Sequence, residues 1–332
     1  MRFFTFKGLL LTTIFMLLGC LSIQAEDDEL ITKQVTVKLD EAGTLPDKIG
    51  SAKKYKITNL KIIGEINGTD WRMIRDMAGR NVSHDETEGN LSELDLSDAS
   101  IVPGGDYYIT CAYFGYPSKI HTSHQVIGDL AFEGCSGLTS LKLPSDIRLI
   151  GRHAFEGCSG LTSITLPSGV TEIGSSAFYG CSGLTSITLP SGVTWIGHSA
   201  FEGCSGLTSI TLPSGVTEIG ESAFANCSGL TSIYVYAEKM PKLRTNMFDG
   251  CDAKKCTVYV PKGTYDDYWL SEFGYFENIV EFDPTDINNV ITSNDAKELS
   301  RYSLNGQRLS APTKGLNIVK YSDGSVKKVA VQ

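Results

Sequence analysis

One string of residues recurs along this chain at a fixed step. GCSGLTSITLPSGV occupies residues 157–170 and returns unchanged from Gly180 and again from Gly203, a step of 23 residues. A repeated string places like side chains in rows, whereas a catalytic site needs unlike groups that converge on one point. One unit of this length cannot bury its own apolar face, so successive units must stack. The repeat therefore predicts a solenoid.

The residues within one unit predict how each coil runs. Leu161, Ile164 and Leu166 alternate with polar residues, as in a strand with one buried face. The Pro-Ser-Gly that follows ends this strand. Residues 170–173 predict a second extended stretch, and residues 175–184 predict a short helical or 3₁₀ return. We expect a β-rich repeat solenoid of the α/β-type leucine-rich kind, with parallel strands stacked at the 23-residue period.

Similar but less regular strings continue the stack on both sides of the identical copies. They occur at residues 57–62, 91–96, 230–235, 257–260 and 278–282. The ends of a solenoid need atypical capping units. The expected domains are a signal peptide at 1–25, N-terminal irregular repeats and a cap at 26–128, regular repeats and a C-terminal cap at 129–283, a linker at 284–300, and a small β module or sorting tail at 301–332.

The unit AFEGCSGLTSITLPSGVTEIGSS resembles the BspA-like, or treponemal-type, leucine-rich repeat. Residues 64–79 and 91–108 resemble the lead-in that such surface proteins carry in Bacteroidetes. The resemblance covers roughly residues 30–283. It implies an exported, surface-displayed, non-enzymatic protein that binds host proteins or mediates adhesion, and it brings no catalytic residues.

The N-terminus predicts export. Arg2 and Lys7 precede an apolar stretch at residues 8–19 that is too short for a typical membrane span. LLGC resembles a lipobox, which makes Cys20 a candidate for lipidation, whereas the residues before Glu26 resemble an ordinary signal-peptidase site. The second site is favoured, because Leu21 and the apolar residue two positions later are unlike a polar lipoprotein tether. Both alternatives place the protein at the cell surface, on the outer membrane, or in the medium.

The tail predicts a separate module. Residues 283–298 are polar and rich in Asn, Asp and Thr, as in a linker. NG and DG then occur between alternating apolar residues and predict hairpins. The segment also resembles a shortened C-terminal sorting domain of the type IX secretion system, through Tyr302, Leu304, Gly306, residues 314–319 and residues 327–331. A stabilising terminal module is the equally weighted alternative.

A column of six cysteines follows the repeat: Cys135, Cys158, Cys181, Cys204, Cys227 and Cys251. In an exported protein an even number of cysteines suggests disulfides. However, equivalent positions of successive coils have nearly parallel Cβ vectors, whereas a disulfide needs vectors that point toward each other. Zinc would require converging ligands. We therefore expect free thiols that pack as small apolar groups.

Composition excludes several function classes. The formal net charge is −9, and no basic cluster suggests nucleic acid; a membrane partner is expected only through lipidation. His121 and His124 have the spacing of metal ligands but fall in a loop-like segment. Only nine charged residues lie between Ser136 and Tyr236, which is few for a polysaccharide-active enzyme. No catalytic, cofactor or metal site is predicted.

Partner contacts are expected where the repeat departs from itself, because stacking alone explains the identical positions. Trp195 stands in a Glu column, and His198 replaces a smaller or charged residue in the same unit. Tyr179 departs from its neighbours, and Tyr234 and Tyr259 replace Thr on the strand face. Exposed Trp and Tyr are enriched at the energetic centres of interfaces. A matrix or cell-surface protein is the expected partner, and a glycan is the alternative.

Overall fold

The computed structural model describes residues 29–113, 116–283, 298–303, 308–309, 315–321 and 326–331. The predicted signal peptide, Cys20 and most of the predicted linker, residues 284–297, lie outside the described residues. The chain divides into two compact units. The first comprises the chain up to Val260 with Thr264–Val280, and the second comprises Pro261–Gly263 with the chain from Glu281.

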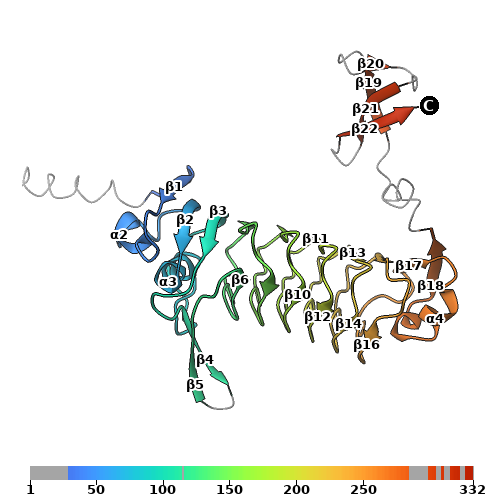
Figure 1. Ribbon diagram of the computed structural model, residues 1–332, viewed down its shortest axis with the longest axis horizontal. Helices are drawn as coiled ribbons and strands as arrows, with labels where there is room; N and C mark the ends of the chain where they lie inside the picture. The colour runs from blue at the N-terminus through green and yellow to red at the C-terminus, as the bar shows by residue number, and fades with distance from the viewer. Residues whose placement is uncertain are drawn as a thin grey trace, which may run out of the picture. The chain divides into compact units, whose positions relative to one another are not determined.

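Stacked coils carry a ten-stranded sheet (Figure 1). Its order is β1-β2-β3-β7-β9-β11-β13-β15-β17-β18. In that order the strands are Val35–Lys38, Asn59–Ile66, Glu93–Ile101, Ser140–Lys142, Ser163–Thr165, Ser186–Thr188, Ser209–Leu212, Ser232–Val235, Thr257–Pro261 and Asn278–Phe282. Neighbouring strands from β1 to β17 pair in parallel.

The register keeps like residues in columns. Ile164 of β9 pairs with Ile187 of β11, and the serine and threonine on either side pair with their counterparts. In both strands the isoleucine is buried while its two neighbours are exposed. This period-two pattern places the apolar column inside the coil and the hydroxyl columns outside. The predicted parallel stacking at the 23-residue step is confirmed.

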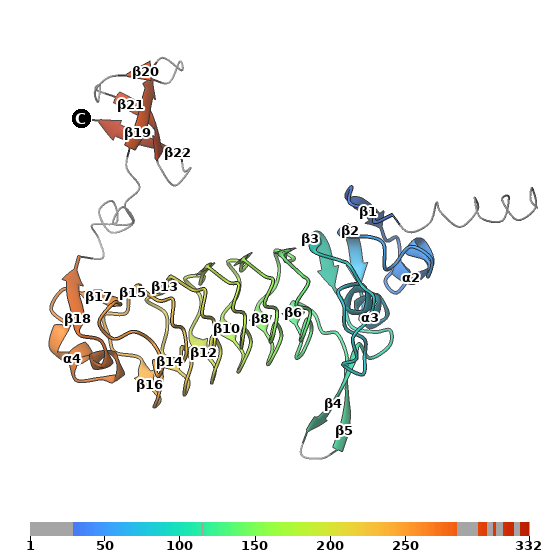
Figure 2. The ribbon, with the colours of Figure 1, turned by 180° about the vertical axis from the view of Figure 1, so that it is seen from behind.

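A second parallel sheet, of six short strands, forms another wall of the coils (Figure 2). Its order is β16-β14-β12-β10-β8-β6. In that order the strands are Lys242–Leu243, Glu218–Ile219, Trp195–Ile196, Glu172–Ile173, Leu149–Ile150 and Val126–Ile127. The isoleucine of each regular coil is buried here too. The predicted second extended stretch is thereby confirmed.

The return between the two sheets is a run of turns, so the predicted helical or 3₁₀ segment is wrong. Ser176 has φ of 54°, a left-handed conformation that a right-handed helix cannot contain. Its amide donates to His198 O in the next coil, and that of Phe178 donates to Ala200 O. The amide of Ala177, between these two, donates to Gly174 O within its own coil. The third wall therefore pairs coil to coil, as a sheet does.

The core of the coils is a ladder of phenylalanines. Phe155 stacks on Phe178 with 5.0 Å between ring centroids, and Phe178 stacks on Phe201 at 5.2 Å. All three are fully buried. Parallel stacking follows from the strict period, because equivalent side chains of adjacent coils adopt one rotamer at one spacing.

The cysteine column lies beside this ladder and is free, as expected. All six thiols are buried. The Sγ–H of Cys181 donates to Phe155 O at 3.0 Å, and that of Cys204 donates to Phe178 O at 3.1 Å. Burial raises the pKa of Cys181 to about 12. These thiols therefore pack against the preceding coil in protonated form and are poor nucleophiles.

The N-terminal part of the solenoid adds two helices and a hairpin. The helices are α2, Leu45–Ile49, and α3, Gly68–Met77. Asn67 begins α3 with a capping box that uses the Asp70 carboxylate. The hairpin pairs β4, Ile109–Tyr113, with β5, Tyr116–Ile120, in antiparallel register.

The C-terminal part closes the phenylalanine ladder. Helix α4, Tyr265–Trp269, and the 3₁₀ helix η1, Glu272–Tyr275, follow β17. Phe273 and Phe276 pack on Phe248, with ring centroids 5.2 and 4.8 Å away, and both are fully buried. Their tilted rings end the parallel stack, as a cap must.

The second unit contains a four-stranded antiparallel sheet in the order β20-β19-β21-β22. Its strands are Arg308–Leu309, Glu298–Ser303, Gly315–Tyr321 and Val326–Val331. A small β module is predicted here from residue 301, but its strand β19 begins at Glu298, so the last three residues of the predicted linker belong to the sheet. Its resemblance to a sorting domain is a separate matter of function.

Candidate binding surfaces

The outer face of the ten-stranded sheet changes character along the solenoid. One outward row passes through Lys61, Asp95 and Lys142, then three threonines, and ends at Tyr234 and Tyr259. Charged groups therefore lie near one end of this row, hydroxyls in the middle and aromatic rings at the other end. Stacking requires only the buried column between the outward rows, so these outward differences are free to serve recognition.

The charged end is internally paired. Lys142 Nζ donates to Asp95 at 2.8 Å, and Lys61 Nζ lies 2.6 Å from Asp98. Burial opposes ionisation of Asp95, but hydrogen bonds from Lys142 and Ser97 lower its pKa to about 2. Asp95 is therefore ionised at neutral pH and cannot act as a general acid there.

Tyr234 and Tyr259 form the aromatic end, as the sequence predicted for the strand face. They pair in register between β15 and β17, and their rings are parallel with centroids 4.6 Å apart. Both side chains are half-buried. The nearby Tyr236 has a raised pKa, because of burial and the neighbouring Tyr234. The two rings together form one apolar surface at the end of the row that contains the threonines.

Trp195 lies on the second sheet, between Glu172 and Glu218 in the adjacent strands. It is half-buried and lines a cleft of about 210 Å³ with Asp129, Arg152 and Glu172 among the other lining residues. The hydrogen bond from Arg244, at 2.9 Å, is the main cause of the lowered pKa of Glu218. Trp195 is thus an aromatic group set among charged ones.

The last two predicted contacts lie on the turn side of the coils. Tyr179 is 40% exposed. His198 is exposed too, but its Nδ1 accepts a hydrogen bond from the Glu221 amide in the next coil at 3.1 Å. One ring nitrogen of His198 is thereby used in stacking. Of the five predicted residues, Tyr234 and Tyr259 are neighbours in one row. The other three belong to three different rows.

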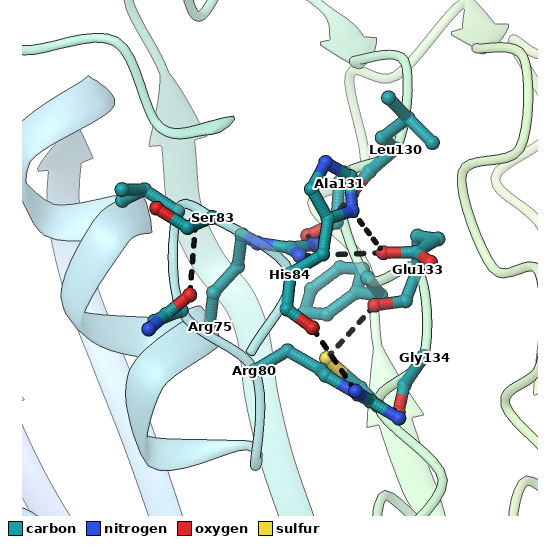
Figure 3. A network of polar contacts seen from close by, with 12 residues as sticks. Arg75, Arg80, Ser83, His84, Leu130, Ala131, Glu133 and Gly134 are labelled. Carbon is teal, nitrogen blue, oxygen red and sulfur yellow. Dashed lines mark hydrogen bonds and ion pairs between the residues drawn. The ribbon is translucent and has the colours of Figure 1, made fainter. Parts of the chain in front are cut away.

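A polar network joins α3 to the first regular coil (Figure 3). The fully buried Arg75 donates to Leu130 O at 2.5 Å and to Ala131 O at 3.0 Å, and lies 3.7 Å from Glu133. His84 contacts the same carboxylate at 2.9 Å. The acceptors of Arg75 are mainly backbone carbonyls, so the network serves the cap rather than a substrate.

Two surface features escaped the sequence prediction. A cleft of about 490 Å³ lies over α3, lined by Lys54, Arg72, Met73 and Asp76 among others. Its charged groups are paired, Lys54 with Asp76 and Arg72 with Asp106. The other feature is a set of exposed rings on α4, where Trp269 is 46% exposed. In the sequence, only the spacing YDDYW indicates the exposed rings on α4. Neither feature repeats along the chain, so the 23-residue period does not reveal it.

Within the described residues, no group of three or more His, Cys, Asp or Glu is placed to hold a metal ion. His121 and His124 both lie exposed in the segment before β6, which has no helix. No helix in the described part of the chain is long and apolar enough to span a membrane.

Comparison with known proteins agrees with the repeat geometry. Residues 125–255 match the model of the BspA type leucine rich repeat region, in six copies. No curated protein matches the chain.

Solved structures with some likeness come from several bacteria. A leucine-rich repeat protein of T. pallidum is 29% identical over 45% of this chain and 78% of its own, with a TM-score of 0.34. One from Bacteroides ovatus is 20% identical over 58% and 61%, with a TM-score of 0.25. A leucine-rich cell surface protein of Faecalibacterium prausnitzii is 17% identical over 77% and 89%, with a TM-score of 0.30.

The 23-residue register, the phenylalanine and cysteine columns and the family model all describe the same segment. Residues 125–255 of this chain are therefore similar to the leucine-rich repeat region of the BspA type.

Proposed function

We propose that this protein is a non-enzymatic surface or secreted protein that binds other proteins, of the extracellular matrix or of a cell surface, and so mediates adhesion. The repeat region supports the proposal, because a solenoid offers a broad rigid surface rather than a closed pocket. The charged side chains of the outer sheet face are paired with each other, which leaves few groups for acid–base chemistry there.

The observation that carries the proposal is the Tyr234–Tyr259 pair. Two parallel tyrosine rings follow the run of three threonines and end this outward row. The buried column explains the stack without them. Tyrosines supply large contact area with little conformational entropy loss, so they favour recognition of a partner.

Export completes the proposal. The predicted signal peptide carries the chain out of the cytoplasm, with Cys20 as the alternative lipid attachment site. The C-terminal module acts as a type IX sorting tail in this scheme, through the residues that resemble such domains. Mass spectrometry of the mature protein tests this part, since an N-terminus at Glu26 and a diacylated Cys20 have different masses.

An array of matrix proteins, cell-surface proteins and glycans, probed with the purified chain, tests the binding role. We expect saturable binding to a protein. The double variant Tyr234→Ala with Tyr259→Ala should weaken the affinity about tenfold. Thr188→Ala, on the same sheet face, is the matched control and should stay within about twofold. No saturable binding to any protein, or equal losses for the two variants, would contradict the proposal.

A carbohydrate-binding role is the second candidate, because parallel rings beside rows of hydroxyls also suit a sugar chain. Binding to glycan spots alone, lost with the tyrosine pair, would favour it over protein binding.

A further inference from the structure

The C-terminal cap exposes an unusual share of apolar side chains. Seven large hydrophobic residues are exposed among the described residues, and five of them lie within Thr264–Val280. These five are Tyr265, Trp269, Leu270, Tyr275 and Val280. The cap is a small part of the chain, so this concentration needs a cause.

Capping does not supply that cause. The inward side of the cap uses Tyr268, Phe273 and Phe276, which are all fully buried. Burial, with a contribution from Asp267, raises the pKa of Tyr268 to about 12, and its hydroxyl donates to Ala237 O at 2.7 Å. A solenoid cap ordinarily presents a polar outer face. The outward rings of α4 and η1 therefore go beyond what closing the core requires.

The outward rings are held in fixed positions. Tyr265 and Trp269, one helical turn apart on α4, are parallel with centroids 6.2 Å apart. A Cβ on Gly274 would lie 2.1 Å from Trp269 O, so η1 packs directly on the end of α4. The Tyr275 hydroxyl, on η1, donates to Cys251 O at 2.9 Å. A rigid aromatic surface loses little entropy when a partner binds.

The charge near these rings is mainly negative. Thr264–Val280 contains four carboxylates, Asp266, Asp267, Glu272 and Glu277, and no Lys, Arg or His. Three of the four are exposed, and Glu272 is half-buried. Three lysines border the segment: Lys262 precedes it in the chain, and Lys254 and Lys255 belong to the stretch that bonds to Glu277 and Asn278. They leave the carboxylates in the majority. A neutral apolar partner would desolvate these carboxylates without compensation, and an anionic partner would be repelled.

We propose that this face of the C-terminal cap, Tyr265 to Tyr275, binds a basic protein segment in which Lys or Arg alternates with apolar residues. The cations lie over the rings of Tyr265 and Trp269, where Asp266 is the nearest carboxylate in the helix, and Asp267 adds to the attraction from farther away. The apolar residues cover Leu270. The site is separate from the Tyr234–Tyr259 surface and rests on the proposed function only in that both bind proteins.

The test uses the full mature chain and a short synthetic peptide of Lys, Ala and Tyr, with a second peptide in which Glu replaces each Lys. Cellohexaose serves as a neutral glycan probe. Titration calorimetry at low and high salt measures the affinities. The variants are Tyr265→Ala with Trp269→Ala, and Asp266→Asn with Asp267→Asn. Leu30→Ala, at an exposed hydrophobic residue that belongs to none of the candidate surfaces, is the matched control.

We expect the Lys peptide to bind and the Glu peptide not to bind. The ring variant should weaken the Lys peptide at least about tenfold, and the Asn variant should weaken it and reduce its salt dependence. Leu30→Ala should stay within about twofold. Unchanged thermal unfolding shows that each variant is folded.

Three results would overturn the inference. One is equal binding of the two peptides, and another is an unchanged affinity in the folded ring variant, which would reveal nonspecific attraction to an acidic protein. The third is stronger binding of cellohexaose than of the Lys peptide at the same rings. None of these results bears on the strand-face tyrosines, so failure here is distinguishable from failure of the proposed function.

Discussion

The middle of the solenoid and its N-terminal cap satisfy the same column of carbonyls by different means. In the middle, the amide of Phe155 donates to Ala177 O in the next coil, and each coil repeats this bond. The first coil has no such predecessor. Its equivalent carbonyl, Ala131 O, accepts instead from Trp71 Nε1 at 3.1 Å and from Arg75 Nη1 at 3.0 Å.

The same replacement occurs elsewhere at that end. In the next coil, Arg152 O accepts a hydrogen bond from the Leu130 amide. The equivalent carbonyl of the first coil, Asp129 O, accepts instead from the Tyr108 hydroxyl at 2.7 Å. The Trp71 ring also continues the phenylalanine ladder, 5.3 Å from Phe132. The difference teaches that a coil in the middle needs only another coil, whereas the cap needs particular side chains, because a buried carbonyl without a donor is costly.

The largest expected effect compares one core ring from each region. Trp71→Ala and Phe178→Ala each remove a fully packed aromatic side chain, so each should cost about 3–5 kcal/mol of unfolding free energy. Trp71→Ala should be the costlier, because it also removes a donor to Ala131 O. Urea unfolding followed by circular dichroism measures both. A cost below about 1 kcal/mol for Trp71→Ala would mean that the cap does not act as a coil.

The next effect isolates the cap's polar donors. Arg75→Met keeps an apolar stem of similar length but removes the donors to Leu130 O and Ala131 O. We expect a loss of about 2 kcal/mol, since hydrogen bonds from charged groups are strong and the carbonyls stay buried. Arg148→Met, on an exposed guanidinium within the coils, is the control and should change stability by less than about 0.5 kcal/mol. Equal losses would contradict the cap assignment.

Much of the middle could be predicted from the sequence, because repetition reports the fold directly. The strand at 163–165, the buried thiol column and the outward tyrosines follow from the period alone. The helical or 3₁₀ return predicted at 175–184 is wrong, because nothing in the sequence distinguishes the left-handed Ser176 from any other serine. Trp71 and Arg75 gave no repeated signal, and their roles appear only once the first coil lies against α3.

The candidate surfaces divide in the same way. Tyr234 and Tyr259 were identifiable because they break a column, and Trp195 for the same reason. The rings at Tyr265 and Trp269 break no column, because the cap has none. Exposure there depends on which side of α4 faces Phe273, and tertiary packing decides that.

A smaller effect concerns the paired charges at the N-terminal end of the sheet face. Asp95 has a folded pKa of about 2, below the ordinary aspartate value of 3.8. A lowered carboxyl pKa means that the stabilisation is fully present above 3.8 and is lost as pH falls toward about 2. Lys142→Met should therefore lower the unfolding free energy at neutral pH by only about 1 kcal/mol, because Lys142 is largely exposed. The stability difference between the wild type and this variant should narrow as pH falls through that acidic window.

Unfolding of both proteins at a series of pH values measures this. Lys239→Met, on another exposed lysine, should show no such pH-dependent difference. A gap that stays constant down to pH 2 would mean that the Lys142 pair does not set the pKa of Asp95.

The smallest effect belongs to the outward hydroxyls of the middle. Thr188→Ala should change the unfolding free energy by less than about 0.5 kcal/mol, because its side chain is exposed and the buried column carries the stack. A melting-temperature loss equal to that of Phe178→Ala would reverse the assignment of inside and outside.

Amide hydrogen exchange in Arg75→Met tests most directly whether the cap takes the place of a missing coil. A solenoid is coupled mainly between nearest neighbours, so a weakened end should open from that end inward. We predict lost protection at the amides of residues 130–138, smaller losses in the following coil, and wild-type protection around Phe201. Uniform loss along all coils, or full protection at 130–138, would contradict the account.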